Sequence, residues 1–215
     1  MTAERLKEFI DAPRLSVGFY RPDALRVARA LLGKTLVHVT EDGPTAARIV
    51  ETEAYRGPLD RAAHSFGGRR TPRNEVMWGP AGRAYVYFVY GMHWCLNVVA
   101  AGEGRPEAVL VRAAEPLLGV DLMRRRRDAR CPDARLLRGP ANLCRSMGIT
   151  GARNGADLTG ESLFILDARA IPASRVRRTP RIGVTYAGDH AALPWRLFVE
   201  GSPAVSGPPF LRAGR

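Results

Sequence analysis

Residues 49–57, IVETEAYRG, place two glutamates and a tyrosine at alternate positions of a segment that reads as a β-strand. Side chains alternate between the two faces of a strand, so Glu51, Glu53 and Tyr55 are expected on one face. Acidic residues are poor strand formers, and like charges in register repel each other. The strand opens into a Gly-Pro break, a common place to present a catalytic group. Solvated or salt-bridged glutamates are the structural alternative.

Arg112 is a second charged residue in apolar surroundings, within the segment VLVRAAEP. Burying an arginine is costly unless a carboxylate faces it. The segment therefore predicts either a structural ion pair or an active-site clamp.

The segment AYVYFVYGMHWCLN is rich in aromatic residues and turns at its centre. Regular pleating puts Tyr85 and Tyr87 on one face, where packing is the simplest role for Tyr85. Tyr90 sits beside Gly91 at the turn, where burial is difficult, and an exposed aromatic in a basic protein suggests a wedge that enters a base stack. Tyr87 and Tyr55 are candidates for the stacking walls of a base pocket.

The histidines and cysteines do not predict a metal or disulfide site. His64 lies in the loop after the carboxylate strand, where it could hydrogen-bond the edge of a base. The other histidines show no ligand spacing with cysteine or carboxylate. Three cysteines without a C-x-x-C pair argue against a disulfide framework, a zinc ribbon or an iron–sulfur cluster. We therefore expect no metal and no cofactor.

The net charge of +12 and the pI near 10.7 favour a polyanionic partner, nucleic acid first and an anionic membrane surface second. All basic residues except Lys7 and Lys34 are arginines, so compositional drift is the alternative explanation. The N-terminus lacks the basic region and apolar run of a signal peptide, and no window approaches the roughly 18 apolar residues of a membrane span. A cytoplasmic location, associated with the nucleoid in a bacterium, is expected.

The chain reads as one mixed α/β domain over residues 1–215, without repeats or linkers. A flexible segment of about 15 residues is expected at the N-terminus and a Pro/Gly-rich tail from Ser202. Asp23 and Gly33 are expected to bound a helix. Further helices are expected within 117–130 and from 139, where Pro140 lies in the first turn. A loop-rich stretch, 56–82, is long enough to suggest function. Strands are expected at 34–40 and 46–55 as a hairpin, on both sides of Tyr90–Gly91–Met92, and at 107–116, 162–169, 181–188 and 195–201.

Several motifs in fixed order give the chain a family resemblance. They are VARALLGKTLV, IVETEAYRGPLDRAAHS, TPRNEVMWGPAGRAYVYFVYGMHWCLNVV, VLVRAAEPL, GPANLC and PWRLFVEGSPAVS, which together span nearly the whole sequence. With them the chain resembles the alkyladenine (3-methyladenine) DNA glycosylase family, the branch distinct from the helix-hairpin-helix glycosylases. The resemblance implies a single domain around a curved antiparallel sheet surrounded by helices, with a protruding β-hairpin that enters DNA.

The resemblance also assigns roles to individual residues. It places the catalytic glutamate on Glu53 rather than Glu51, and on Arg112 the arginine that helps to hold the attacking water. Tyr55 and Tyr87 match the base-stacking tyrosines. The remaining matches are His64, which stacks on and hydrogen-bonds the flipped base; Asn97, which crowds out the exocyclic amine of guanine; and Tyr90, with Met92 beside it, which intercalates.

The activity implied is that of a monofunctional glycosylase of base excision repair. Such an enzyme flips an alkylated or deaminated purine out of double-stranded DNA and hydrolyses its N-glycosidic bond. A lyase step would need an amine for a Schiff base, and neither Lys7 nor Lys34 lies in a motif position that suits one. A monomer bound to damaged duplex DNA is expected. 3-Methyladenine, 7-methylguanine, hypoxanthine and ethenoadenine are equally compatible substrates.

The chain departs from the family at the helix that begins with GP. Family members often have a lysine where this chain has Asn142. A phosphate contact at this helix would therefore have to come from Arg145 or from the helix amides. Arg69 and Arg73 are the other candidate phosphate contacts. The tract at 124–127 is not a signature of the family, and its role is open.

Two other classes of function were compared with this one. A non-catalytic nucleic-acid-binding protein of the same fold would be expected to have lost part of the set formed by Glu53, Arg112 and the pocket residues. A carbohydrate hydrolase could use Glu51 and Glu53 as its acid pair, because alternate strand residues lie roughly 6–7 Å apart. It would need neither the basic surface nor a tyrosine at a hairpin turn.

Overall fold

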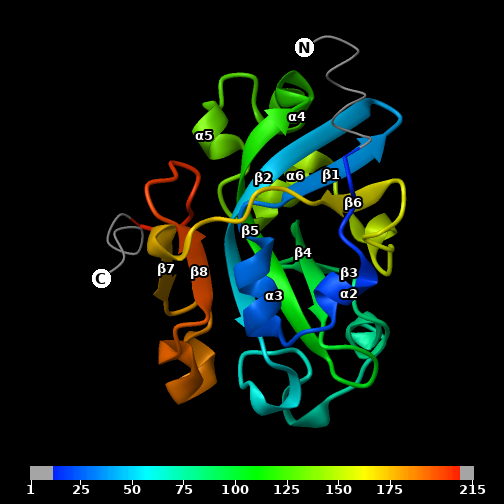
Figure 1. Ribbon diagram of the computed structural model, residues 1–215, viewed down its shortest axis with the longest axis vertical. Helices are drawn as coiled ribbons and strands as arrows, with labels where there is room; N and C mark the ends of the chain where they lie inside the picture. The colour runs from blue at the N-terminus through cyan, green and yellow to red at the C-terminus, as the bar shows by residue number, and fades with distance from the viewer. Residues whose placement is uncertain (1–11, 209–215) are drawn as a thin grey trace.

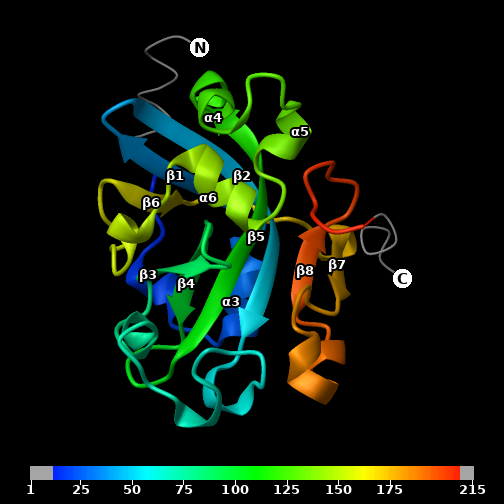
Figure 2. The same ribbon diagram turned by 180° about the vertical axis from the view of Figure 1, so that it is seen from behind.

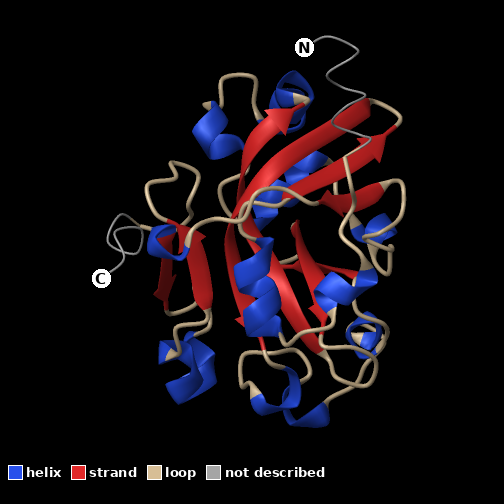
Figure 3. Cartoon of the chain, viewed as in Figure 1, coloured by secondary structure: helices blue, strands red, loops and turns tan. Residues whose placement is uncertain are grey.

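A curled antiparallel sheet of eight strands forms the centre of the protein, with helices and loops around it (Figure 1; Figure 3). The computed structural model describes residues 12–208. Six strands run in the order β3-β4-β5-β2-β1-β6, and β8 pairs with both β2 and β7. The strands are β1 (Thr35–Thr40), β2 (Gly43–Tyr55), β3 (Ala84–Val89), β4 (His93–Ala100), β5 (Glu107–Leu118), β6 (Leu163–Leu166), β7 (Val176–Thr179) and β8 (Arg196–Val199).

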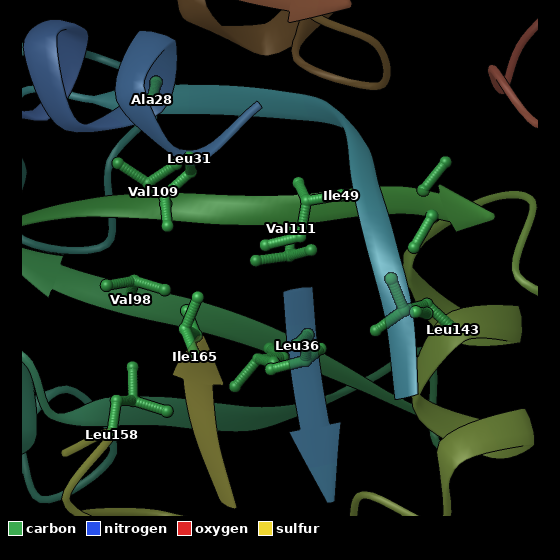
Figure 4. Close-up of a cluster of buried hydrophobic side chains, with 14 of the residues drawn as sticks. Ala28, Leu31, Leu36, Ile49, Val98, Val109, Val111, Leu143, Leu158 and Ile165 are labelled. Carbon is green, nitrogen blue, oxygen red and sulfur yellow. The ribbon is translucent and has the colours of Figure 1, made fainter. Parts of the chain in front are cut away.

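Strand β2 makes the sheet curl, because it changes its neighbour halfway along. Its first part pairs with β1 and its second part pairs with β8 from Glu51 to Glu53, while β5 lies along its other edge throughout. The register against β5 shifts on both sides of Glu51. Such irregularities bend a strand and increase its twist, and Figure 4 shows the bend of β2 beside Ile49. The bend therefore falls where the two glutamates lie.

Both hairpins expected from the sequence are present. Strands β1 and β2 pair antiparallel around a tight turn. Strands β3 and β4 pair from Ala84↔Val98 to Val89↔His93, which leaves Tyr90, Gly91 and Met92 as the connection. Tyr90 has a φ of 53° and Gly91 a φ of 66°, so both adopt the left-handed conformation that hairpin turns require.

The helices pack on both faces of the sheet. The Asp23 carboxylate caps α3 as expected, since it accepts hydrogen bonds from the backbone amides of Leu25 and Arg26. Helix α3 lies in front of the sheet in Figure 1 and α6 lies in front of it in Figure 2. The helices are α2 (Val17–Tyr20), α3 (Ala24–Leu31), α4 (Val120–Arg127), α5 (Asp133–Leu136) and α6 (Pro140–Met147), with short 3-10 helices η1 (Gly57–Leu59), η2 (Phe66–Gly68), η3 (Glu75–Trp78), η4 (Gly151–Arg153), η5 (Ala173–Arg175) and η6 (Thr185–Ala192).

One main core joins the sheet to these helices. Leu31 of α3 and Leu143 of α6 are both fully buried in it, and each such side chain contributes about 1.5–3 kcal/mol relative to exposure. Figure 4 shows the central part of this core, which includes Ala28, Leu31, Leu36, Ile49, Val98, Val109, Val111, Leu143, Leu158 and Ile165.

The strand expected at 181–188 is wrong. Residues 181–184 have no regular structure and the rest belongs to η6. Gly183 has a φ of 78° and Gly188 a φ of 56°, so neither adopts an extended conformation. The sequence reading missed the short, arginine-rich strand β7, which pairs only with β8. Strand β5 runs to Leu118, further than expected.

The two ends of the described segment are packed against the sheet. Arg14 forms a β-bridge with Leu166, and Leu15 is buried. Near the other end, Val205 and Ser206 are buried. The flexible N-terminal segment expected from the sequence falls mostly on residues 1–11, and the end of the expected tail on 209–215, outside the described residues. No helix within residues 12–208 has the length and apolar character to cross a membrane.

Candidate active site

Glu53 lies at the centre of a hydrogen-bonded cluster on β2. It has no exposed surface. Its Oε1 accepts a hydrogen bond of 2.8 Å from the Ile182 amide and lies 3.3 Å from the Arg112 guanidinium. Its Oε2 accepts a hydrogen bond of 2.9 Å from the Tyr55 hydroxyl. Both oxygens of Glu53 are therefore engaged, one by Tyr55 and the other by Ile182 and Arg112.

The Tyr55 hydroxyl remains protonated in this position. Burial, and next the negative charge of Glu53, raise the pKa of Tyr55 well above its ordinary value. Its ring lines the pocket described below. The hydrogen bond between Tyr55 and Glu53 puts these two side chains on one face of β2. Arg112 contacts both Glu51 and Glu53, so Glu51 lies on the same face, as the sequence predicted.

Glu51 is held by a second set of partners. Its Oε1 accepts a 2.6 Å hydrogen bond from Arg196 and lies 3.3 Å from Arg112. The amide and hydroxyl of Ser206 donate to it at 2.7 and 2.9 Å. Both Glu51 and Arg196 are fully buried. Both oxygens of Glu51 are therefore engaged within the fold, by Arg196, Arg112 and Ser206.

Arg112 links the two carboxylates. Its Nε lies 3.3 Å from Glu51 and its Nη1 lies 3.3 Å from Glu53. Burial lowers the pKa of Arg112, but the charges of Glu53 and Glu51 outweigh this and raise it above the ordinary value. The guanidinium is thus a permanent cation that serves both of the roles the sequence suggested, a structural ion pair and a clamp beside the candidate base.

An aromatic pocket, called the base pocket from here on, opens next to Glu53. The Tyr85 and Tyr87 rings stack with centroids 5.3 Å apart, and His64 meets Tyr87 edge-on at 4.7 Å. Asn97 is nearly buried and donates to the Tyr85 carbonyl at 3.3 Å. The walls therefore combine aromatic faces with a small number of polar groups, as small-molecule sites do. The lining residues are Tyr55, Ala62, His64, Met77, Tyr85, Tyr87, Asn97, Ala108 and Tyr186.

His64 is neutral and held in one orientation. Burial, and then the charges of Arg73 and Arg69, lower its pKa to about 4. Its Nδ1 lies 2.8 Å from the Tyr85 hydroxyl. A phenol hydroxyl and a neutral imidazole nitrogen can share one hydrogen bond, so this contact orients the His64 ring.

A cleft leads from the hairpin turn to the beginning of α6. It has a volume of about 380 Å³, and its lining includes Arg73, Tyr90, Arg112 and Pro140. Tyr90 is 82% exposed and Met92 is 68% exposed. The two side chains predicted to intercalate thus lie at the surface of the turn.

The candidate phosphate contacts separate into two groups. Arg73 lines the cleft, and Arg69 lines an adjoining hollow of about 320 Å³, called the side hollow, together with Arg61 and Phe66. Arg145 does not line either of them and donates to the carbonyl of Arg126 at 2.9 Å. The structure therefore brings Arg69 and Arg73 to the site and leaves Arg145 outside it.

The arginine tract of α4 is largely engaged within the fold. Arg124 pairs with Asp121 at 2.8 Å and with Asp133 at 2.7 Å, and Arg126 pairs with Asp42 at 2.9 Å. Arg127 donates to the side chain of Asn142. These contacts give the tract a structural role. They also engage Asn142, which stands where family members often have a lysine.

Two residues that the sequence did not predict for the site, Asp60 and Arg181, hold the segments around Tyr55 and His64 in place. Asp60 and Arg181 form a completely buried ion pair at 2.5 Å. The Arg181 guanidinium lies between the rings of Tyr55 and Trp195, 4.8 and 4.9 Å from their centroids. Asp60 also accepts from the Ala62 amide at 3.0 Å. The pair thereby connects the loop before His64 to the segment around Ile182, whose amide contacts Glu53. Asp60 and Arg181 lie 121 residues apart, so no local sequence pattern predicts that they pair.

Lys34 is engaged by oxygen atoms of the fold. Lys34 is nearly buried, and its Nζ lies 2.5 Å from Asp167 and 2.5 Å from the carbonyl of Ala168. No group of three or more His, Cys, Asp or Glu side chains within residues 12–208 is placed to hold a metal ion.

Comparison with known proteins finds a matching family and relatives over most of the chain. The family described as "Methylpurine-DNA glycosylase (MPG)" matches residues 18–203. A protein of Desulfitobacterium hafniense (strain Y51) named "Putative 3-methyladenine DNA glycosylase" is 48% identical over 90% of this chain and 98% of its own length. Proteins of the same name from Anaeromyxobacter dehalogenans (strain 2CP-C) and Clostridium acetobutylicum are 52% and 43% identical, over 91% and 87% of this chain and 87% and 95% of their own lengths.

Proposed function

The chain belongs to the methylpurine-DNA glycosylase family, and from this premise we propose that it excises damaged purines from double-stranded DNA as a monofunctional, monomeric enzyme. The observation that carries the proposal is the position of Glu53. This fully buried carboxylate accepts a hydrogen bond from Tyr55, whose ring lines an aromatic pocket together with Tyr87. A water-activating base beside a stacking pocket is what N-glycosidic bond hydrolysis of a flipped nucleotide requires.

The first step is extrusion of the damaged nucleotide. A base within a duplex cannot be attacked at its sugar, and flipping costs a few kcal/mol of unstacking. Tyr90 stands at the hairpin turn with 82% of its surface exposed and also borders the cleft. It would fill the gap in the duplex, with Met92 beside it, and offset part of that cost.

The second step is hydrolysis at C1′ of the sugar. Glu53 accepts a proton from water, the water oxygen bonds to C1′, and the C1′–N bond breaks with its electron pair passing to the purine. The transition state resembles an oxocarbenium ion, as in glycoside hydrolysis. Arg112, 3.3 Å from the carboxylate, would help to hold Glu53 and the water in line.

The pocket selects among bases through its charge and shape. A purine methylated at N3 or N7 is cationic, leaves readily, and is attracted to aromatic faces such as those of Tyr55 and Tyr87. The neutral His64 adds no repulsion toward such a cation. Asn97 lines the same pocket, where it would crowd the exocyclic amine of guanine.

The proposed chemistry ends with base removal. A lyase step needs a free amine near C1′, whereas Lys34 is bound to Asp167 and Ala168. Borohydride should therefore trap no covalent protein–DNA adduct, and a trapped adduct would overturn the monofunctional assignment.

Base release from duplexes that carry 3-methyladenine, 7-methylguanine, hypoxanthine or ethenoadenine tests the proposal directly. The parent protein should release at least one of these bases, and Glu53→Gln should lose the activity while it still binds DNA. Asp121→Asn, at an exposed pair on α4, serves as the matched carboxylate control and should act like the parent. Equal release by Glu53→Gln and the parent would contradict the catalytic assignment.

A further inference from the structure

Tyr186 is an exposed aromatic residue at the junction of the base pocket, the cleft and the side hollow. It lines all three, and His64 is its counterpart on the opposite side of the junction. Tyr186 is 70% exposed. Figures 1 and 2 both show its segment, the orange 185–192, and the cyan loop 56–82 on either side of the lower end of β2. Tyr186 therefore lies where the base pocket and the cleft meet.

The base pocket is narrow in this conformation. Its volume is about 40 Å³. One water needs roughly 10–15 Å³ of such space, so the pocket holds a few waters. A bicyclic purine has several times the volume of a water molecule, so it fills the pocket closely and is admitted more readily if a wall moves.

Most of the walls are not free to move. Met77, Tyr85, Asn97 and Ala108 are buried in the sheet and its surroundings. His64 is fixed by its hydrogen bond to Tyr85, and Tyr55 is held from one side by Glu53 and from the other by the guanidinium of Arg181. Moving any of these side chains would break buried contacts.

Tyr186 is the exception among these walls. Within residues 12–208 its side chain is held by a hydrogen bond of 3.3 Å from its hydroxyl to the Ala62 carbonyl, a long contact compared with the usual 2.7–2.8 Å. Gly183 and Gly188 flank it with positive φ values of 78° and 56°. Its rotation away from the pocket exposes little additional surface, because most of the ring already faces solvent.

We propose that Tyr186 is a gate residue of the base pocket, which swings aside to admit a flipped purine nucleotide and then closes against its outer edge. In the open position the hydroxyl leaves Ala62. In the closed position the ring adds a third aromatic surface to those of Tyr55 and Tyr87 and separates the base from solvent. The inference rests on the proposed function and adds to it a residue that controls how the base enters and leaves.

Two substitutions separate the role of the Tyr186 hydroxyl from that of its ring. Tyr186→Phe removes the bond to Ala62 but keeps the ring, so the gate opens more easily and still closes. Tyr186→Ala removes the gate. Phe66→Ala is the matched control, because Phe66 is also an exposed ring, at 47%, but lines only the side hollow.

Stopped-flow fluorescence of an environment-sensitive purine analogue in duplex DNA measures base entry and exit, and single-turnover base release measures chemistry. We expect Tyr186→Ala to raise the exit rate of the base by about tenfold. This factor corresponds to the loss of one aromatic stacking contact, which contributes about 1–3 kcal/mol. Tyr186→Phe should raise the entry rate, and it should raise the exit rate by less than Tyr186→Ala does because the stacking ring remains. Phe66→Ala should have the entry and exit rates of the parent. All three variants should have the melting temperature of the parent, because these side chains are exposed.

Unchanged entry and exit rates in Tyr186→Ala would overturn the gate, and so would equal effects of Tyr186→Ala and Phe66→Ala. These outcomes differ from failure of the proposed function, in which the parent itself releases none of the four damaged bases. A parent that releases base together with an unaltered Tyr186→Ala would leave the glycosylase assignment intact and remove the gate alone.

Discussion

The Tyr55 hydroxyl donates a 2.9 Å hydrogen bond to Oε2 of Glu53 from two positions along the same strand. The ring of Tyr55 lines the base pocket at the same time. One side chain therefore contacts both the candidate base and the space reserved for the substrate. In the proposed mechanism, Tyr55 would therefore couple recognition of a stacked purine to the alignment of Glu53.

Tyr55→Phe should separate these two roles. The variant keeps the stacking ring but removes a hydrogen bond to a charged group, worth about 1.5–3 kcal/mol. We expect single-turnover base release to slow by about ten- to a hundredfold, while affinity for lesion DNA changes by less than about threefold. Tyr55→Ala should reduce both quantities. A Tyr55→Phe variant as fast as the parent would show that the hydroxyl does not position Glu53.

Glu51→Gln should reduce stability more than any exposed carboxylate substitution. It leaves the fully buried Arg196 and the largely buried Arg112 with one carboxylate fewer. Breaking a buried ion pair by removing one partner costs about 3–5 kcal/mol. Urea unfolding monitored by tryptophan fluorescence measures the difference. Glu75→Gln, at an exposed pair with Arg70, is the control and should leave the unfolding midpoint unchanged.

Tyr90→Gly should affect stability and function in opposite directions. Tyr90 holds a φ of 53°, which costs a non-glycine residue about 1–3 kcal/mol. Glycine relieves this strain, offset in part by its greater freedom in the unfolded chain. The melting temperature should stay the same or rise, whereas the fluorescence of a flipped base analogue should fall because nothing fills the gap. Tyr90→Ser keeps the strain and should lose flipping without any gain in stability. Parent-like flipping in both variants would contradict the intercalating role.

His64 should make stability depend on pH below neutrality. Its pKa is lowered to about 4 from an ordinary value of 6.5, so between these values the unfolded chain binds the proton that the folded protein does not. The free energy of unfolding should therefore decrease as pH falls from 6.5 toward 4 and lose this dependence below about 4. His64→Gln should flatten the profile in that window, as measured by urea unfolding at a series of pH values. An identical profile in the variant would exclude His64 as the source.

The sequence predicted most of what depends on local pattern. The alternating residues of β1–β4 gave both hairpins, Asp23 marked the start of α3, and the acidic strand identified Glu53 and Tyr55 as neighbours. The choice of Glu53 over Glu51 required the family resemblance. In the structure the two glutamates differ in their partners, such as Ser206 beside Glu51, which no spacing along β2 could indicate.

The features that were missed depend on contacts distant in sequence or on backbone conformation. The segment 181–188 has the alternation of a strand, but the positive φ values of Gly183 and Gly188 prevent pairing. That error concealed Tyr186 and the amide of Ile182. Asp60 and Arg181 each resemble ordinary surface charges until the fold buries them together.

The hydrogen bonds from Ser206 to Glu51 join residues separated by 155 positions. During synthesis, β2 with its two carboxylates leaves the ribosome early, whereas Arg196 and Ser206 emerge only near the end. Until then Glu51 lacks the partners that neutralise it within the sheet, and Arg112 has no fixed place between the carboxylates. The buried cluster around Glu51 is therefore completed last, and a nascent chain that stops before residue 206 would carry the whole set of pocket aromatics without it.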